Sequence, residues 1–518
     1  MSADPRVVKL DGRSLRIEDV VAVARCHARV ELSDKARAAM AVSNAIVTSI
    51  VERNEVVYGV TTGFGKLSDI AIPPHRLAEL QVNLIRSHAV GVGPLLSEAE
   101  TRAMMLLRAN VISKGYSGAR ALLVDLLAGM LNAGLYPPIP EQGSVGASGD
   151  LAPLAHLALS MIGEGTLTRD GKSGPAAEML RENGLEPVEL GPKEGITLIN
   201  GTQAHTAIAA LLVHDAERLW RTAHVAAAMS LEALKGTPVA FDARIQEARG
   251  QIGQVESARV MRLLLADSEI RESHRSNDRR VQDAYGLRCV PQVHGPVLDA
   301  LRWISGVVTR ELNAATDNPL VFDSGEMLSG GNFHGQAVAM ALDFLAIIMT
   351  NLAVISERRT DRLVHPDLNE GMPAFLSPDA GTNSGFMMAQ VTAASITSEC
   401  KVLAHPSSVD SIPTDGSKED VVPMAMGAAW KARRVMQNVR NVLSIELMCG
   451  AQGIDFRAPL KPAVAVARAH ERVRSIVARL ERDRVMSGDI ASLSAEIFAG
   501  GFDGCIDWND EVEGEMTQ

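Results

Sequence analysis

Aromatic residues are scarce in this chain of 518 residues: Phe, Trp and Tyr together make up 3% of it, although 46% of its residues are hydrophobic. A core must therefore be built from Ala, Leu, Val, Ile and the 21 Met residues, a composition that favours helices over sheets. With 22% charged residues, the balance is that of a globular protein with a large core. The length predicts two or three structural units, or one large helical body.

Basic residues are outnumbered, since 51 Lys and Arg stand against 62 Asp and Glu and the formal net charge is −11. This balance argues against nucleic acid or an anionic membrane as a partner. The five cysteines are scattered and form no CxxC pair, which argues against a disulfide framework or a thiolate zinc site and favours a reducing compartment. The first residues, MSADPRVVKLDGR, lack the apolar stretch of a secretion signal. We predict a cytoplasmic protein.

Signals of membrane insertion and of metal binding are missing as well. The most apolar long run, 337–355, is interrupted by Asp343 and Asn351, so it is interpreted as a buried helix rather than a membrane span. No HExxH occurs, and no metal is assigned to the histidines, which lack metal-ligand spacing. The histidines considered are His88, His294 and His334.

Long runs almost free of Gly and Pro dominate the chain after residue 200. The clearest covers 201–236 and stops at Gly-Thr-Pro. Similar runs follow at about 292–313, 335–364, 384–404, 420–452 and 461–485. Several are apolar around much of their circumference, which predicts a central bundle of long helices packed against other copies of itself.

Shorter patterns fill the part before residue 200, among them a strand-like VVYGV at 56–60 and a helix that ends near Gly115. The predicted fold is therefore mainly α. It has a smaller N-terminal α+β part, 1–200, followed by the long-helix bundle and a C-terminal helical region, 201–518.

Small residues crowd the stretch GSVGASGDLAPLAH, 143–156, directly before a helical pattern. It has neither the Gly-Lys-Ser/Thr ending of a nucleotide P-loop nor the spacing of a dinucleotide fingerprint. One interpretation is a structural turn before a helix, with Asp150 near the N-cap and Pro153 in the first turn.

The other interpretation is chemistry on the backbone at Ala147-Ser148-Gly149. If the chain bends sharply there, the Gly149 nitrogen can attack the Ala147 carbonyl carbon, and a five-membered ring closes with loss of water. Glycine leaves that nitrogen unhindered. Loss of a second water from Ser148 gives a 4-methylideneimidazol-5-one, an electrophile that no ordinary side chain supplies. A helix that begins at about Asp150 would add positive potential at the ring.

This stretch resembles the cofactor-forming motif of the aromatic amino acid ammonia-lyase family, which covers histidine, phenylalanine and tyrosine ammonia-lyases and the related aminomutases. Further blocks follow in the family's order along nearly the whole chain: VYGVTTGFG (57–65), LIRSHAVGVG (84–93), EGITLINGTQ (194–203), QDAYGLRCVPQV (282–293), SGGNFHG (329–335), NSGFMMAQVTAA (383–394) and AHPSSVDSIPT (404–414). The resemblance implies a fumarase/aspartase-like helical architecture and a homotetramer with each site assembled from more than one subunit. It also implies a methylideneimidazolone as cofactor, no external cofactor and a small aromatic amino acid as substrate.

Elimination of ammonia needs an electrophile that captures the amine and a strong base beside the β-carbon. By resemblance Tyr58 is that base, and a phenol of pKa about 10 must be tuned downward to act near neutrality; a loop tyrosine that packs as a lid is the alternative. Arg288 resembles the clamp for the substrate carboxylate, which a guanidinium meets bidentately. Tyr285 resembles the second active-site tyrosine and lies on the same face as Arg288 if this stretch is helical. The remaining matches are the amides of Asn200 and Gln282, which hold cofactor or substrate, and Phe333, a pocket wall.

Two places bear on the substrate side chain. In the family, the pair after LIR lies over the substrate ring, and this chain has Ser87-His88, as histidine enzymes do. Glu419 matches the acidic residue that faces the imidazole in histidine enzymes. A carboxylate suits an imidazole N–H, whereas beside a phenyl ring it would be buried without a bond. Both features indicate L-histidine.

The chain departs from the histidine pattern around Glu419. Lys418 and Pro423 stand where many histidine enzymes carry Gln and Ser, and Asp415-Gly416 replaces a Ser-Ala. An ion pair with Lys418 would divert the Glu419 carboxylate, so tyrosine or phenylalanine stays an alternative substrate. An aminomutase, which returns the amine to the β-carbon, stays open too and needs a tighter lid. A non-enzymatic helical assembly protein is disfavoured, because the triad, the tyrosine base and the arginine clamp are all retained.

Overall fold

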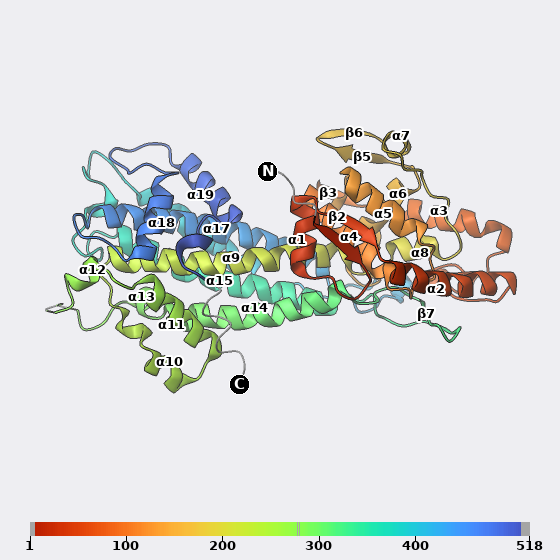
Figure 1. The fold of residues 1–518 in the computed structure, drawn as a ribbon, viewed down its shortest axis with the longest axis horizontal. Coiled ribbons are helices and arrows are strands. Elements are labelled where there is room, and N and C mark those ends of the chain that lie inside the picture. The colour runs from red at the N-terminus through yellow and green to blue at the C-terminus, as the bar shows by residue number, and fades with distance from the viewer. Residues whose placement is uncertain (1–5, 277, 279, 509–518) are drawn as a thin grey trace. The chain divides into compact units, whose positions relative to one another are not determined.

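Helices dominate the chain, and the mainly α fold is confirmed (Figure 1). The computed structural model describes residues 6–276, 278 and 280–508, in which nineteen α-helices and four two-stranded sheets form. Two compact units are present. The first unit contains 1–214, 304–343 and 406–430, and the second contains 215–303, 344–405 and the chain from 431 onward. Two segments that follow residue 200, 304–343 and 406–430, belong to the first unit. The predicted division into 1–200 and 201–518 stays a prediction.

In the first unit a parallel strand pair opens the chain, β1 (Val7–Leu10) beside β2 (Arg29–Leu32), joined by α1 (Ile17–Cys26). Helix α4 (Glu98–Ser113) packs against α1 and α5 (Leu122–Ala133). A capping box between Ser97 and Glu100 starts α4, and it ends just before Gly115 at φ +85, as predicted. Every residue of α4 from Glu100 onward is buried, so α4 is the core of this unit.

Three helices of the first unit contain or adjoin predicted site residues. They are α3 (Leu77–His88), α6 (Leu151–Met161) and α8 (Glu194–Ile199), and each packs against the other two. The pair β3 (Val92–Leu95) and β4 (Pro140–Gln142) is antiparallel and leads into the glycine-rich stretch. The remaining elements are α2 (Asp34–Glu52), the hairpin β5 (Thr166–Arg169) and β6 (Lys172–Pro175), α7 (Ala176–Glu182), and the hairpin β7 (Leu320–Val321) and β8 (Met327–Leu328).

The strand predicted at 56–60 is wrong, because this segment forms a turn. The Thr61 hydroxyl accepts the Val57 N–H at 2.9 Å and donates to the Glu55 carbonyl at 2.7 Å. Side-chain bonds to the local backbone thus replace the ladder that a strand would need.

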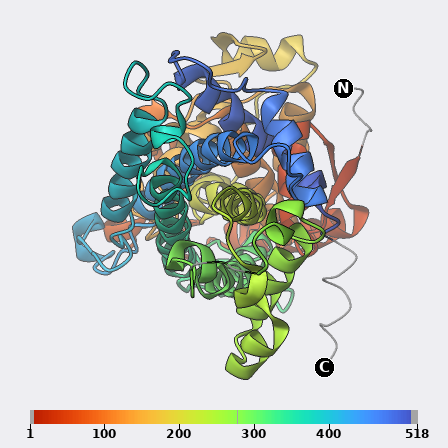
Figure 2. The same ribbon diagram turned by 90° about the vertical axis from the view of Figure 1, so that its left-hand side faces the viewer.

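The predicted long runs are confirmed as helices in five of six cases: α9 (Gln203–Ala233), α14 (Val290–Leu312), α15 (Gln336–Val364), α16 (Met387–Leu403) and α17 (Ala425–Asp455). Figure 2 views α9 nearly end-on. The run at 461–485 is only partly helical, as α18 (Val464–Arg474). After α18 the backbone of Leu480 bonds to the Gln452 side chain at 2.9 and 3.0 Å, so tertiary contacts override the helical pattern.

The second unit also contains the short helices α10 (Ala243–Arg249), α11 (Ile252–Leu264), α12 (Glu269–Glu272), α13 (Tyr285–Arg288) and α19 (Ser487–Ala499). Its core holds a fully buried ion pair between Arg359 and Glu446 at 2.5 Å. The Glu446 carboxylate also accepts from the hydroxyls of Ser230 and Ser356, at 2.7 and 2.6 Å, so the buried charge is well satisfied.

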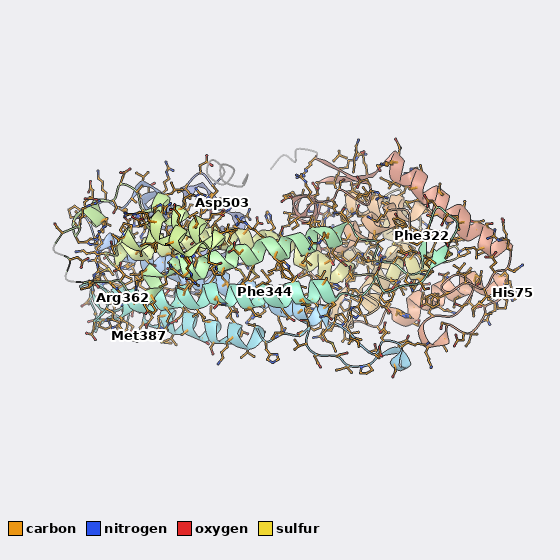
Figure 3. The ribbon with its side chains drawn as sticks, turned by 90° about the horizontal axis from the view of Figure 1, so that it is seen from below. His75, Phe322, Phe344, Arg362, Met387 and Asp503 are labelled. Carbon is orange, nitrogen blue, oxygen red and sulfur yellow. The ribbon has the colours of Figure 1, made fainter. Side chains whose placement is uncertain are left out.

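Helix α15 contains the apolar run predicted as a buried helix. By length and composition alone it could cross a membrane, but 67% of its most apolar window is buried inside the structure. This confirms the interpretation of 337–355 as a core helix. One stripe of α15 stays exposed, by 37% to 51% for each side chain, and consists of Met340, Phe344, Ile347 and Val354. Phe344 is labelled in Figure 3.

Candidate active site

The predicted triad lies on a sharp bend of the first unit, between β4 and α6. Gly149 has φ +75, and a Cβ there would lie 2.1 Å from the carbonyl oxygen of Gly201. The backbone on both sides of Gly149 bonds to Gly201. The Asp150 N–H donates to the Gly201 carbonyl at 2.7 Å, and the Gly201 N–H donates to the Ser148 carbonyl at 3.3 Å. A residue with a side chain cannot take the place of Gly149 without moving this backbone.

The hydroxyl and the carbonyl of Ser148 both have hydrogen-bond partners. Its hydroxyl donates to the carboxylate of Glu419. Its carbonyl accepts the Asn200 side-chain amide at 2.8 Å, in the orientation that the surrounding hydrogen bonds favour, where the Asn200 oxygen accepts from Asn318 N–H at 2.9 Å. Asn200 is 3% exposed. The structure therefore brings together Ser148, Asn200 and Glu419, three residues predicted separately from the sequence.

Asp150 follows the triad, is fully buried and is the N-cap residue of α6, as predicted, but its side chain makes no capping hydrogen bond to that helix. Its Oδ2 instead accepts the N–H groups of Ala204 and His205, at 2.8 and 3.0 Å, in the first turn of α9. The His205 Nδ1 lies 2.8 Å from the same oxygen. Burial raises the pKa of Asp150, but the His205 ring and these hydrogen bonds outweigh it, so the net shift is downward. An ionised Asp150 thus ties the bend to α9.

Glu419 is half-buried on the segment that precedes α17, and its second oxygen accepts the Thr414 hydroxyl at 2.5 Å. Lys418, the residue before Glu419, has an exposed side chain. Because both carboxylate oxygens face hydroxyl groups, the Glu419 carboxylate points toward the triad and is not diverted to Lys418.

Tyr58 lies half-buried in the turn that replaced the predicted strand. Its pKa is raised above 10, chiefly by burial; the Gly65 N–H bonded to its hydroxyl lowers it, and the carboxylates of Asp415 and Glu419 raise it further. This direction is opposite to the downward tuning expected of a base. The Glu419 carboxylate thus acts on the Tyr58 hydroxyl, but the charged groups around Tyr58 in the first unit do not activate it as a base.

Ser87 and His88 form the last turn of α3, where Ser87 is exposed and His88 half-buried. The Ser87 hydroxyl donates to the Leu84 carbonyl at 3.0 Å, and His88 Nδ1 lies 2.8 Å from the same carbonyl. These side chains end a helix that packs on α6, which follows the triad, and on α8, which precedes Asn200.

Phe333 lies half-buried in the loop between β8 and α15. Two residues later, Gly335 N–H donates to the Gly146 carbonyl at 2.9 Å. This bond anchors the loop of Phe333 directly to the residue before the triad.

Gln282, Tyr285 and Arg288 belong to the second unit, on and just before α13. Gln282 and Tyr285 are exposed, and the Arg288 guanidinium stacks on the Tyr285 ring at 4.5 Å, so the shared helical face is confirmed. The Arg288 Nε is buried and makes no hydrogen bond within the described residues. A half-buried guanidinium with an unused donor is suited to a carboxylate.

Sequence reasoning missed two parts of this arrangement. One is Gly201, whose backbone lies against Gly149 of the triad. The small residues of NGT, 200–202, are a sequence signal for such a close approach of two backbones. Asp415 departs from the pattern of histidine enzymes, but no sequence pattern indicates that its carboxylate contacts Gly65.

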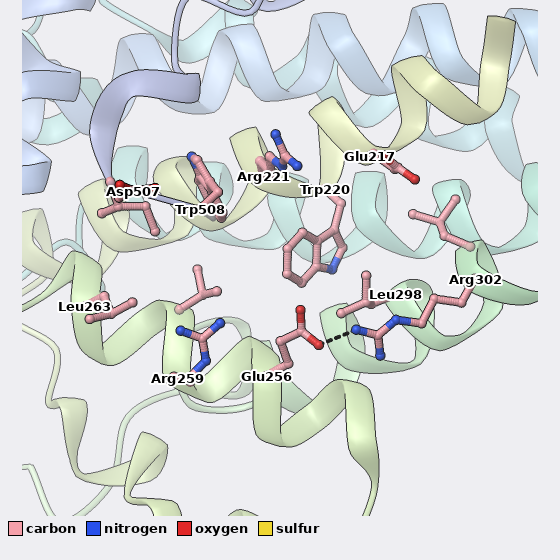
Figure 4. A pocket seen from close by; sticks show the side chains of 13 residues that line it. Glu217, Trp220, Arg221, Glu256, Arg259, Leu263, Leu298, Arg302, Asp507 and Trp508 are labelled. Carbon is pink, nitrogen blue, oxygen red and sulfur yellow. Dashed lines mark hydrogen bonds and ion pairs between the residues drawn. The ribbon is translucent and has the colours of Figure 1, made fainter. Parts of the chain in front are cut away.

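A separate pocket lies in the second unit, and none of the predicted site residues line it (Figure 4). It has room for about 220 Å³, and the indoles of Trp220 and Trp508, which meet edge-to-face at 6.4 Å, are part of its lining. Of its arginines, Arg302 pairs with Glu256 at 2.5 Å, and Arg221 lies 5.6 Å over the Trp508 ring.

Comparison with known proteins extends this picture to nearly the whole chain. Residues 15–475 match the profile of a family described as aromatic amino acid lyase. The chain belongs to this family. It is 51% identical over 508 residues to the histidine ammonia-lyase of Koribacter versatilis (strain Ellin345), which covers 96% of this chain and 98% of that relative.

Solved structures of aromatic amino acid lyases and aminomutases share the fold. The histidine ammonia-lyase from Trypanosoma cruzi is 44% identical with a TM-score of 0.90, covering 96% of this chain and 94% of that one. The tyrosine aminomutase from Streptomyces globisporus is 38% identical with a TM-score of 0.92, covering 96% and 98%. The resemblance to the aromatic amino acid ammonia-lyase family and its helical architecture is confirmed.

Proposed function

We propose that this chain is a carbon-nitrogen lyase that eliminates ammonia from L-histidine to give trans-urocanate. The observation that carries the substrate is the hydrogen bond between Ser148 and Glu419, because it brings a carboxylate suited to an imidazole N–H to the centre of the triad. Relatives about half identical over nearly their whole length, named histidine ammonia-lyase, support the same reaction.

We propose further that Ala147-Ser148-Gly149 cyclise to the 4-methylideneimidazol-5-one, with no external cofactor. The residues fit this group: Ala147 is 3% exposed, Gly149 has φ +75 with no space for a side chain, and Ser148 is held at its carbonyl. Once formed, the group supplies an electrophilic methylidene carbon that takes up the substrate amine. Asn200 holds the carbonyl beside it.

Tyr58 is the proposed base that removes the substrate β-proton. Two carboxylates near its hydroxyl disfavour the phenolate, so Tyr58 needs positive charge to act near neutrality. We propose that this charge arrives on assembly of the site. Ser87, His88 and Phe333 would then border the substrate ring, with Glu419 at its imidazole.

Arg288 is the proposed clamp for the substrate carboxylate, with Tyr285 and Gln282 beside it. The clamp has an unused donor, which supports a role completed in the assembled protein. We propose a homotetramer in which each site draws on more than one subunit. The exposed apolar stripe of α15 supports self-association. In the second unit Trp303, 48% exposed, meets Phe344 of that stripe edge-to-face, with ring centroids 5.9 Å apart.

We propose a small aromatic amino acid as the ligand of this protein, and neither nucleic acid nor a membrane as a partner. The proposed location is the cytoplasm. The cysteines Cys26, Cys289, Cys400, Cys449 and Cys505 are all free thiols, which agrees with a reducing compartment.

Parallel turnover assays of the purified protein with L-histidine, L-tyrosine and L-phenylalanine test this function. Conjugated products absorb in the ultraviolet where the substrates do not, and nuclear magnetic resonance of the products detects any β-amino acid. Urocanate from L-histidine is the expected result. Cinnamate or coumarate instead would overturn the substrate, and a β-amino acid would turn the proposal to an aminomutase. The Ser148→Ala variant should assemble, keep by peptide mass at least the water that the Ser148 side chain would lose, and lose nearly all turnover.

A further inference from the structure

The Tyr58 loop and the segment that carries Glu419 meet at Gly65. Gly65 has φ +53, and a Cβ there would lie 2.1 Å from Oδ2 of Asp415 and 2.7 Å from its Oδ1. The Asp415 carboxylate therefore occupies the space that any side chain at position 65 would need. The Lys66 N–H donates to the same carboxylate at 3.3 Å.

The contact is reciprocal. Gly416 has φ +58, and a Cβ there would meet the methylene carbons of Lys66 at 3.4 to 3.7 Å. Asp415 itself has φ +47, an uncommon conformation for a residue with a side chain. Gly65 and Lys66 thus pack closely against Asp415 and Gly416. Asp415-Gly416 is also the pair that replaces the Ser-Ala of histidine enzymes. Backbone strain held by such a contact points to a constraint on the site.

Gly65 also lies close to the Tyr58 hydroxyl, since its backbone N–H lowers the pKa of that phenol. The residue that the Asp415 carboxylate contacts is therefore a neighbour of the Tyr58 hydroxyl. On the other side of Asp415, Thr414 donates to Glu419. One short segment, 414–416, thus contacts both the loop of the proposed base and Glu419, the carboxylate proposed to bind the substrate ring.

We propose that Asp415 is a positioning residue that clamps the Gly65–Lys66 backbone and so fixes the hydroxyl of Tyr58 beside the triad. This role rests on the proposed function of Tyr58 as the base. Asp415 does not touch the reacting atoms; it acts through Gly65. It also costs the base part of its reactivity, because its negative charge disfavours the phenolate.

The charged groups around the Tyr58 hydroxyl define what a variant changes. Asp415 and Glu419 face it from the segment before α17, and Lys66, from its own loop, packs its methylene carbons over Gly416. Asp415→Asn removes one of the two negative charges but keeps an oxygen for the Lys66 N–H. Asp415→Ala removes both the charge and the acceptor. The two variants therefore separate the clamp from the charge.

Steady-state rates against pH test the proposal, with the substrate that the wild type turns over. We expect Asp415→Ala to lower kcat by about tenfold, because small misplacements of a base are costly. Asp415→Asn should recover most of that rate and move the rising limb of kcat/KM to lower pH, since a phenol freed of one negative neighbour ionises more readily. Asp410→Ala is the matched control: this exposed carboxylate on the same segment accepts from its neighbour Ser411 N–H at 2.9 Å.

Two results would overturn the proposal: wild-type rates in Asp415→Ala, or equal losses in both variants with the rising limb unmoved. Peptide mass spectrometry keeps this outcome separate from the proposed function. Wild-type turnover and the loss of two waters at 147–149 test the function itself, and Asp415 variants are compared only where that mass loss is complete.

Discussion

The hydroxyl of Ser148 donates a hydrogen bond to the carboxylate of Glu419, although the two residues are 271 positions apart in the chain. If Ser148 loses that hydroxyl as water on ring formation, the Glu419 oxygen loses its donor. A carboxylate oxygen left in a partly buried site without a donor is costly, so it favours a ligand that brings an N–H, while the other oxygen keeps the Thr414 hydroxyl. Maturation of the triad and recognition of an imidazole are thus linked through one oxygen atom.

Glu419→Gln should lower kcat/KM for L-histidine by roughly tenfold to a hundredfold, the usual range for a hydrogen bond to a charged group. Turnover of L-phenylalanine, which has no N–H on its ring, should change far less. Parallel measurements on both substrates check this. Equal losses for the two amino acids would contradict an imidazole contact at Glu419.

Gly149→Ala should abolish ring formation, because the new methyl group would lie 2.1 Å from the Gly201 carbonyl oxygen. Gly134→Ala is a matched control: Gly134 has φ +71, close to the φ +75 of Gly149, but nothing lies within 4 Å of its Cβ position. The control should therefore lose about 1 kcal/mol of stability and keep the two-water mass loss. If both variants mature equally, the close approach of Gly201 is not what requires glycine.

The large features of this fold follow from local patterns. The long helices could be predicted because runs such as 201–236 lack Gly and Pro over many turns. The errors occurred where tertiary or side-chain bonds override propensity: Thr61 bonds turn 56–60 into a loop, and Gln452 holds Leu480 outside a helix. No periodicity encodes these contacts.

The candidate site was predictable residue by residue but not as geometry. Motifs indicated Ser148, Asn200 and Glu419, and the fold brings these three together. Asp150 is the N-cap residue of α6, as predicted, but no local pattern indicated that its side chain bonds to the start of α9, more than fifty residues later. The upward shift of the Tyr58 pKa depends on Asp415, which is close to it only in the folded chain.

Phe344→Asp should weaken assembly, since it places a charge in the centre of the exposed stripe on α15. Sedimentation velocity should then find species smaller than a tetramer. If active sites are shared between subunits, turnover should fall with the tetramer fraction while circular dichroism stays helical. Val402→Asp tests a 72% exposed apolar position at the end of α16, outside the stripe, and should leave the tetramer intact. A tetramer that survives Phe344→Asp would contradict this surface.

Glu232 should make the second unit less stable as the pH rises. It is 2% exposed, and burial raises its pKa from 4.5 to about 7, although the Ser268 hydroxyl and the Ala463 N–H lower it. Below pH 4.5 the group is protonated in both folded and unfolded chains, so it costs nothing. Between pH 4.5 and about 7 the unfolded chain ionises first, and stability is lost progressively, up to about 3 kcal/mol. Glu232→Gln stays neutral and keeps an acceptor for Ala463, so its Tm should match the wild type at pH 4.5 and exceed it at pH 8. Thermal unfolding at both pH values checks this, and a difference of the same size at both would mean that the Glu232 carboxyl does not titrate in this way.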